Sequence, residues 1–118
     1  MNKSSFCVLC VFLLLASCRS LTSVTTIEAN KSFVLGEGKH GSYSAQIKNV
    51  GSDLIEVFMV NSSKTINSLG ILKVNQSATY RVPENSEVQF KNLSPLKNGV
   101  IEIKANGDTN LTMGYKSN

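Results

Sequence analysis

Apolar and polar residues alternate with a period of two over much of this chain. In residues 42–48, for example, Tyr43, Ala45 and Ile47 alternate with polar neighbours. Successive side chains of a β-strand point to opposite faces, so such a segment is expected to form an antiparallel strand with one buried and one solvated face. The segments that share this pattern are residues 42–48, 77–82, 87–91, 100–104 and 110–115.

Two further segments are more apolar. Residues 54–60 are apolar on both faces except at Glu56, which predicts a central strand covered from both sides. Residues 69–74 predict a shorter strand, in which Gly70 marks a β-bulge or a close approach of another backbone. Residues 25–29 and 32–35 are weaker strand candidates.

Together these segments predict an all-β protein. Short strands follow one another at close intervals, separated by turns rich in Asn, Gly, Ser and Asp, and no segment has the period of an amphipathic helix. The expected fold is an antiparallel two-sheet sandwich, with a small β-barrel as the alternative. The expected core residues are Tyr43, Ile47, Val57, Tyr80, Val88, Phe90, Ile101, Ile103, Leu111 and Met113.

Residues 47–57, followed by residues 74–80, resemble the Ig-like accessory modules of bacterial surface proteins. The resemblance lies in an Asn-x-Gly turn between two strands and in a turn that leads into a Thr-Tyr strand, with Asn75 where such modules usually have Gly. It implies an Ig-like sandwich and no particular chemistry.

The N-terminus has the pattern of an export signal. Lys3 precedes eleven apolar residues, 6–16. A helix of that length spans about 16 Å, well short of a hydrocarbon core of about 30 Å. The sequence Leu15-Ala16-Ser17-Cys18 that ends this stretch resembles the lipobox of bacterial lipoproteins. That resemblance implies a diacylated Cys18 at the mature N-terminus; the alternative is an ordinary secretory signal cleaved after Cys18.

The cysteines fit the lipobox interpretation. All three, Cys7, Cys10 and Cys18, lie at or before the cleavage point, so the mature chain has no internal disulfide. The predicted organisation is a signal peptide over 1–17, the anchor and a short spacer over 18–23, and a sandwich domain over 24–118. The residue after the cysteine is Arg19 and not Asp, which by resemblance implies the outer membrane in a bacterium with two membranes.

Charge and composition exclude several function classes. The 12 Lys and Arg and 8 Asp and Glu are scattered singly, without the basic stretch of a nucleic-acid-binding protein. A single histidine, His40, and no cysteine after Cys18 leave too few residues for a zinc site or a nucleophile–histidine pair. We therefore expect no metal, no cofactor and no catalytic activity. Every aromatic side chain of the five alternating segments belongs to the apolar set, which predicts core packing and not a glycan-binding platform.

The most unusual local stretch is Gly36–Gly41, in which three glycines surround Glu37, Lys39 and His40. These three residues are the candidate binding loop, and the alternative is a plain connection between strands. The sequence as a whole predicts a lipid-anchored binding or structural module that contacts an envelope protein or glycan. The alternative is an accessory or inhibitor protein that acts on an envelope enzyme.

Overall fold

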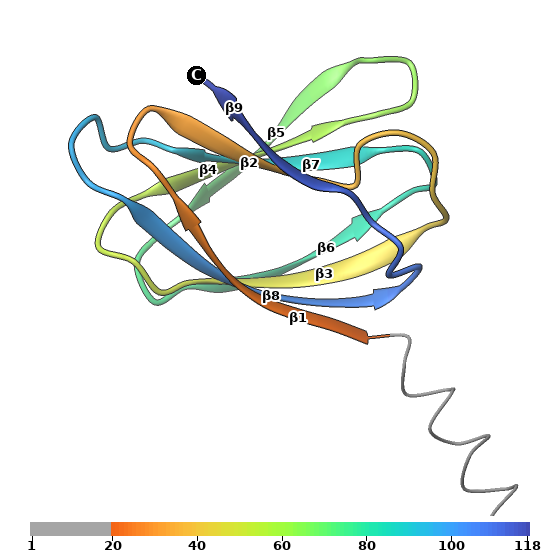
Figure 1. The fold of residues 1–118 in the computed structure, drawn as a ribbon, viewed down its shortest axis with the longest axis horizontal. Coiled ribbons are helices and arrows are strands. Elements are labelled where there is room, and N and C mark those ends of the chain that lie inside the picture. Colours follow the sequence, from red (N-terminus) through yellow and green to blue (C-terminus); the bar gives the residue numbers. More distant parts are fainter. Residues whose placement is uncertain (1–19) are drawn as a thin grey trace, which may run out of the picture.

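A computed structural model describes residues 20–118, which form nine β-strands and no helix (Figure 1). Cys18 and the predicted signal segment lie outside the described residues. The strands are β1 (Ser20–Ile27), β2 (Lys31–Leu35), β3 (Tyr43–Asn49), β4 (Ile55–Val60), β5 (Ile66–Leu72), β6 (Ser77–Val82), β7 (Glu87–Asn92), β8 (Gly99–Gly107) and β9 (Met113–Ser117).

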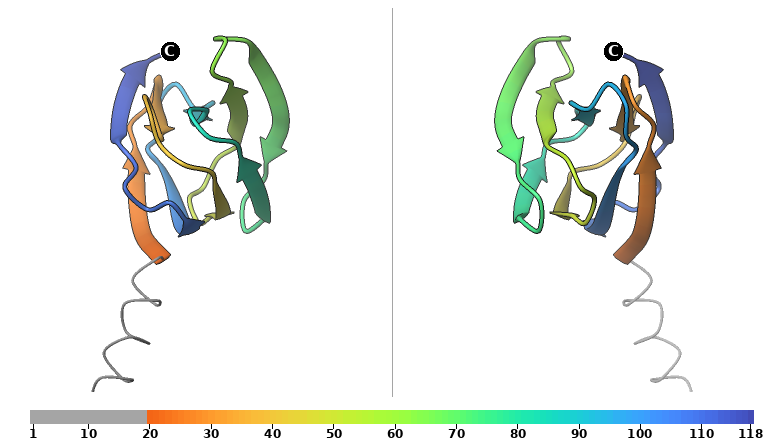
Figure 2. Two further views of the ribbon diagram at one scale, coloured as in Figure 1. Left: turned by 90° about the vertical axis from the view of Figure 1, so that its right-hand side faces the viewer. Right: turned by 90° about the vertical axis from the view of Figure 1, so that its left-hand side faces the viewer.

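The strands form two antiparallel sheets that face each other. The four-stranded sheet has the order β1-β8-β3-β6 and the five-stranded sheet the order β5-β4-β7-β2-β9. In the end views of Figure 2, β5 and β9 stand at opposite margins of the five-stranded sheet. The predicted two-sheet sandwich is therefore confirmed.

The Ig-like topology, by contrast, is wrong. Only β4 and β5 are consecutive strands that pair with each other; every other connection passes from one sheet to the other. An Ig sandwich keeps several consecutive pairs within one sheet. The observed order is that of a jelly roll, with β9 added beside β2. Period-two patterning identifies strands and their inner faces, but it does not say which strand pairs with which.

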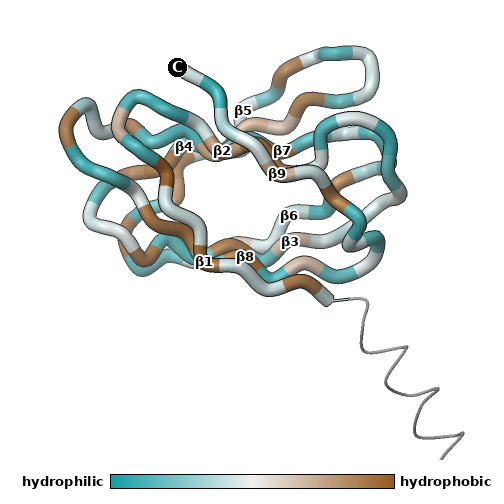
Figure 3. The backbone as a smooth tube through the Cα atoms, in the orientation of Figure 1, coloured by the Kyte–Doolittle hydropathy of each residue, from teal (hydrophilic) through white to brown (hydrophobic). Residues whose placement is uncertain are grey.

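The core lies between the sheets and contains most of the residues expected there. Hydrophobic and hydrophilic positions alternate along the strands that enclose it (Figure 3). Tyr80 and Leu111 are partly buried against this core, whereas Met113 is 41% exposed and its prediction is wrong. The core residues that were predicted and are buried are Tyr43, Ile47, Val57, Val88, Phe90, Ile101 and Ile103.

Met113 and Tyr115 are exposed because β9 is an edge strand. The predicted strand over 110–115 forms instead over Met113–Ser117 and pairs only with β2. Tyr115 contacts the ring of Phe33 edge-on, with the ring centroids 5.5 Å apart, yet it remains 55% exposed. An edge strand has a neighbour on one side only, which leaves its inward side chains partly uncovered.

The most apolar segments also differ from expectation. β4 lies inside the five-stranded sheet, but Glu56 and Phe58 are half-buried on its outer face, which no second layer covers. The predicted strand over 69–74 is β5, an exposed edge strand that begins and ends earlier. The bulge predicted at Gly70 is confirmed: the β4–β5 register shifts between Val57 and Phe58, and Gly70 has a φ of 105°.

The first strand is longer than predicted. β1 begins at Ser20, so residues 20–23 of the predicted spacer pair with β8 and belong to the four-stranded sheet. Ser23 and Thr25 take inward positions of this strand, and these polar residues hide its period-two pattern. Residues 20–118 contain no helix long and apolar enough to cross a membrane.

The sandwich has two ends, which differ in composition. Ser20 lies at the proximal end, because it pairs with Asn106 near the end of β8. The connections at this end are residues 36–42, 61–65, 83–86 and 108–112. The connections at the opposite, distal end are residues 28–30, 50–54, 73–76 and 93–98.

Candidate functional site

The predicted binding loop, Gly36–Gly41, is fastened to the β6–β7 turn by His40. The His40 backbone N–H donates to Asn85 Oδ1 (2.9 Å), and the Asn85 N–H donates to the His40 carbonyl (3.1 Å). The imidazole Nε2 lies 2.7 Å from the Ser86 carbonyl oxygen and Nδ1 lies 2.6 Å from the Gly41 carbonyl oxygen. Both ring nitrogens thus face backbone carbonyl oxygens, and a neutral imidazole donates to one of the two.

The residues after β8 hold the other side of the same loop. The Gly36 N–H donates to the Thr112 carbonyl (2.8 Å), and the Thr112 hydroxyl donates to the Glu37 carbonyl (2.9 Å). The Gly41 N–H donates to Asp108 Oδ2 (2.6 Å). These bonds favour the interpretation of the loop as a structural connection.

Tyr43 contacts this connection from the side of the core. Its hydroxyl donates to the Leu35 carbonyl (3.1 Å), and its ring meets His40 edge-on at 5.4 Å. Burial, and to a smaller extent the charge of Glu87, raises the pKa of Tyr43, so the hydroxyl keeps its proton and remains a donor. A side chain at Gly36 would place its Cβ 2.7 Å from the Tyr43 hydroxyl, which explains the glycine there.

The candidate residues of this loop do not form a chemical site. Glu37 and Lys39 are exposed, and neither joins the contacts that His40 makes. Within residues 20–118, no group of three or more His, Cys, Asp or Glu side chains is placed to hold a metal ion.

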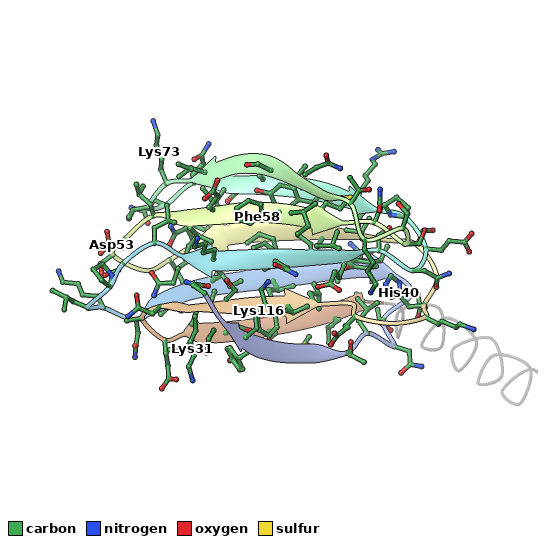
Figure 4. All side chains as sticks on the ribbon, turned by 90° about the horizontal axis from the view of Figure 1, so that it is seen from above. Lys31, His40, Asp53, Phe58, Lys73 and Lys116 are labelled. Carbon is green, nitrogen blue, oxygen red and sulfur yellow. The ribbon has the colours of Figure 1, made fainter. Side chains whose placement is uncertain are left out.

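A hollow that the sequence did not reveal lies on the outer face of the five-stranded sheet. We call it the outer trough; its volume is about 250 Å³. Figure 4 looks onto this face and shows Phe58 and Lys116 on either side of it. The residues that line it include Ser32, Phe58, Ile66, Gln89, Lys91 and Lys116.

Ser32 lies between the strands that flank the trough. Its side chain is on the outer face, yet it is 2% exposed, because its hydroxyl donates to Asn118 Oδ1 and Asn118 also lines the trough. A second hollow of about 230 Å³, over Val34 and Gly114, shares Gln89 and Lys116 with the trough. The two hollows therefore adjoin on the outer face of the sheet, and we refer to them together as the groove.

Sequence reasoning missed Phe58 because residues 54–60 looked apolar on both faces. The available signal was Glu56, which lies two residues before Phe58 and therefore on the same face of the strand. A carboxylate belongs on a solvated face, so Phe58 belonged there as well.

A second feature that was missed is an apolar surface at the distal end, which we call the distal patch: Leu54, Val74, Leu93 and Leu96. These are all the large hydrophobic residues that are exposed in the connections of residues 20–118; Leu96 is 88% exposed. The outermost turn of the 93–98 connection is correspondingly hydrophobic in Figure 3.

Hydrogen bonds hold the distal connections side by side. The Leu93 N–H donates to the Leu54 carbonyl (3.2 Å). The buried Asn49 amide donates to the carbonyls of Asp53 (2.7 Å) and Leu72 (3.0 Å). The distal patch is therefore formed by three connections that are tied together.

Neither the family models nor the curated protein sequences contain a match to this chain. Solved structures do match it in fold. Procruciferin, an 11S globulin from Brassica napus, matches with a TM-score of 0.57 and 15% identity over 86% of this chain and 24% of its own. The Schizosaccharomyces pombe Cnp3 cupin domain matches with a TM-score of 0.52 and 16% identity over 77% of this chain and 58% of its own.

RmlC from Streptococcus suis, solved in complex with dTDP-D-xylose, matches with a TM-score of 0.51 and 15% identity. The match covers 78% of this chain and 46% of RmlC, so the chain spans less than two thirds of each of these three proteins. At such identities the likeness shows the fold alone, a cupin-like jelly roll. An 11S globulin and a protein solved with a bound sugar nucleotide share it, so the fold does not decide whether this chain is an enzyme.

Proposed function

We propose that this protein is a lipid-anchored binding module of the bacterial cell envelope, held at Cys18 and docked onto an envelope protein through its distal patch. The observation that carries the proposal is the separation of two features. The strand that follows Cys18 begins at the proximal end, and the exposed leucines lie at the distal end.

The position of Ser20 limits how the anchored domain sits. Two residues of chain cover at most about 7 Å, so acyl chains on Cys18 would bring the proximal end to the bilayer surface. The nine residues of β8 run between the two ends and span about 30 Å. An anchored domain would thus hold the distal patch away from the lipid. The residue after the cysteine, Arg19, favours the outer membrane where the bacterium has two.

The chemistry of the distal patch indicates a protein partner. Monomeric proteins seldom expose adjoining large apolar side chains unless they bind something there. Lys73 and Lys97 lie beside the patch, and Asp53 is the acidic residue among them. Glu28 and Lys31 at the same end pair with each other at 3.0 Å. An apolar surface with acidic residues at its rim is the complementary partner.

Two features favour this function over inhibition of an envelope enzyme. The longest connection of residues 20–118, residues 36–42, is fastened on both sides and is therefore poorly suited to enter an active site. At the distal end, three adjoining connections each expose at least one large apolar side chain.

The anchor is tested by Cys18→Ala in the full-length chain. We expect this variant to lose labelling by a fatty-acid analogue, and either to leave the membrane fraction or to remain as an unprocessed precursor. The acyl chains matter because one chain gives only marginal membrane binding, whereas two hold a protein firmly. A Cys18→Ala protein that still incorporates the label would refute the anchor.

The docking surface is tested by photo-crosslinking in intact cells, with a photoreactive amino acid at position 96 or, as the matched control, at position 39 of the proximal end. We expect one protein crosslinked from position 96 and not from position 39. The crosslink should disappear when Leu54 and Leu93 are both changed to Lys. A crosslink that survives this double change, or that forms equally from both positions, would contradict docking through the distal patch.

A further inference from the structure

Two lysines flank the floor of the outer trough. Lys91 in β7 and Lys116 in β9 are the cross-strand neighbours of Ser32, one on each side. Opposite side chains on neighbouring strands lie about 5 Å apart at Cβ, so both ammonium groups reach the space above Ser32. The Ser32 hydroxyl itself donates to Asn118 Oδ1.

Neither lysine forms an ion pair: within residues 20–118 the structure has one ion pair, Lys31–Glu28, which lies elsewhere. Glu56, the other cross-strand neighbour of Lys91, keeps its charge, and its Oε2 accepts a hydrogen bond from the Ser68 hydroxyl (3.4 Å). Glu87 Oε2 accepts one from the Gln89 amide (2.8 Å). An anion placed between the two ammonium groups would be attracted by both of them.

The other walls of the trough suit a sugar ring. Phe58 and Ile66 form an apolar side, against which the C–H face of a pyranose can pack. Gln89 and Ser117 provide amide and hydroxyl groups for the hydroxyls of the sugar. The volume, about 250 Å³, is below the range of about 300–1,000 Å³ typical of drug-sized ligands. A single sugar-sized unit is therefore the appropriate occupant.

The adjoining hollow is more acidic than the trough, because two carboxylates line it together with the shared Lys116. Its lining includes Glu37 and Glu87 beside Val34 and Gly114. A second carboxylate would be repelled there, whereas a neutral sugar would be accepted. Because the hollows share Gln89 and Lys116, one chain can occupy both.

We propose that this groove binds an acidic glycan in which a uronate alternates with a neutral sugar. The uronate carboxylate lies between Lys91 and Lys116, its ring packs on Phe58, and the neutral sugar lies over Val34. The groove lies on the outer face of the five-stranded sheet, and none of its lining residues belongs to the distal patch.

The test is a binding titration of the full-length protein in detergent micelles. Four probes are compared. The first is a hyaluronan tetrasaccharide, in which uronate and neutral sugar alternate. The others are tetragalacturonate, neutral chitotetraose and free glucuronate. We expect the hyaluronan tetrasaccharide to bind best and chitotetraose about tenfold or more weaker. Tetragalacturonate should bind more weakly than the alternating chain, and free glucuronate weakest among the acidic probes.

Two charge-matched double variants identify the site. K91M/K116M should weaken hyaluronan binding about tenfold, and K73M/K97M, which removes the same charge at the distal end, should leave it within about twofold. Phe58→Leu should weaken binding of the tetrasaccharide and leave that of free glucuronate unchanged. Unfolding midpoints equal to that of the parent protein would show that the variants are folded.

Several results would overturn the proposal. Equal losses in the two double variants would indicate attraction to net charge and not a site. Chitotetraose binding as tightly as hyaluronan would exclude recognition of the carboxylate, and tetragalacturonate binding as tightly would exclude the alternation. If free glucuronate binds as tightly as the tetrasaccharide, the groove recognises an anion and not a glycan chain.

Discussion

The two ends of this sandwich use connections of similar length in opposite ways. At the proximal end, the side chains of His40, Asp108 and Thr112 bond to backbone atoms of the neighbouring connections. At the distal end, two buried amides, Asn49 and Asn92, hold the backbone together from inside. On the outer surface of that end, Leu54, Leu93 and Leu96 are exposed.

This difference shows that an unusual sequence is a poor guide to a binding surface. Gly36–Gly41 stands out by its glycines and charges, yet both ends of the loop and the His40 side chain are hydrogen-bonded within the molecule. Residues 93–98 look ordinary, yet Leu96 projects into solvent. The loop therefore offers a ligand only its exposed Glu37 and Lys39 side chains, whereas exposed apolar area gains free energy when a partner covers it.

The largest loss of stability is expected when a buried amide of the distal end is removed. Asn92→Ala removes the hydrogen bonds that Nδ2 donates to the carbonyls of Ile27 (3.0 Å) and Lys97 (2.8 Å). It also removes the bond that Asn92 Oδ1 accepts from the Ser94 N–H (2.9 Å). We expect the free energy of unfolding to fall by about 3 kcal/mol, because buried backbone groups lose their partners. Denaturant titration of the purified protein measures this loss.

Asn49→Ala should cost a similar amount, and the exposed Asn98 gives the control. Asn98→Ala is expected to change the free energy of unfolding by less than about 0.5 kcal/mol. If Asn92→Ala is as mild as Asn98→Ala, the distal connections do not depend on the buried amides.

High pH tests the support beneath the proximal loop. The pKa of Tyr43 is raised in the folded protein, so an unfolded chain releases this proton first, near pH 10. The contribution of Tyr43 to stability is therefore complete below about pH 10 and declines above it, by up to about 1.4 kcal/mol for each pH unit.

Tyr43→Phe separates this effect from that of the other titrating groups. At pH 7 the variant should be less stable than the parent by about 1 kcal/mol, because the bond to the Leu35 carbonyl is lost. Between pH 10 and 12 the difference between the two proteins should shrink and then change sign, as measured by denaturant titration at each pH. Parallel pH curves would contradict this role of the buried hydroxyl.

A smaller effect is expected at His40 itself. His40→Ala removes the ring contacts to Ser86 and Gly41 but keeps the backbone bonds to Asn85. Because the side chain is only half-buried, the loss should be about 1 kcal/mol in thermal or denaturant unfolding. Photo-crosslinking from position 96 should be unchanged in this variant. Loss of that crosslink would show that the proximal loop takes part in docking after all.

The sequence predicts the strands of this protein better than their arrangement. Alternation in residues 42–48 and 100–104 identifies β3 and β8 and their buried faces, because period two is a local property. The pairing of β3 with β8 joins segments more than fifty residues apart, and nothing local encodes it. This is why the Ig-like and jelly-roll topologies were not distinguished.

The candidate sites were less predictable, for a related reason. The outer trough needs Lys91 and Lys116 on either side of Ser32, which depends on the register of three strands. The distal patch needs the connections around Leu54, Val74 and Leu93 to meet at one end. Both depend on topology, so the residue types alone did not reveal them.

Quenching of a fluorophore by labelled membrane lipids reports directly on the orientation of the anchored domain. Acylated Cys18 is the only cysteine of the predicted mature chain, so a cysteine introduced at Lys39 or Lys97 accepts a unique fluorophore. The lipidated protein is reconstituted in vesicles whose headgroups carry a quencher. We expect strong quenching of the label at position 39, at the proximal end, and little at position 97, at the distal end. Equal quenching at the two positions, or stronger quenching at position 97, would contradict it.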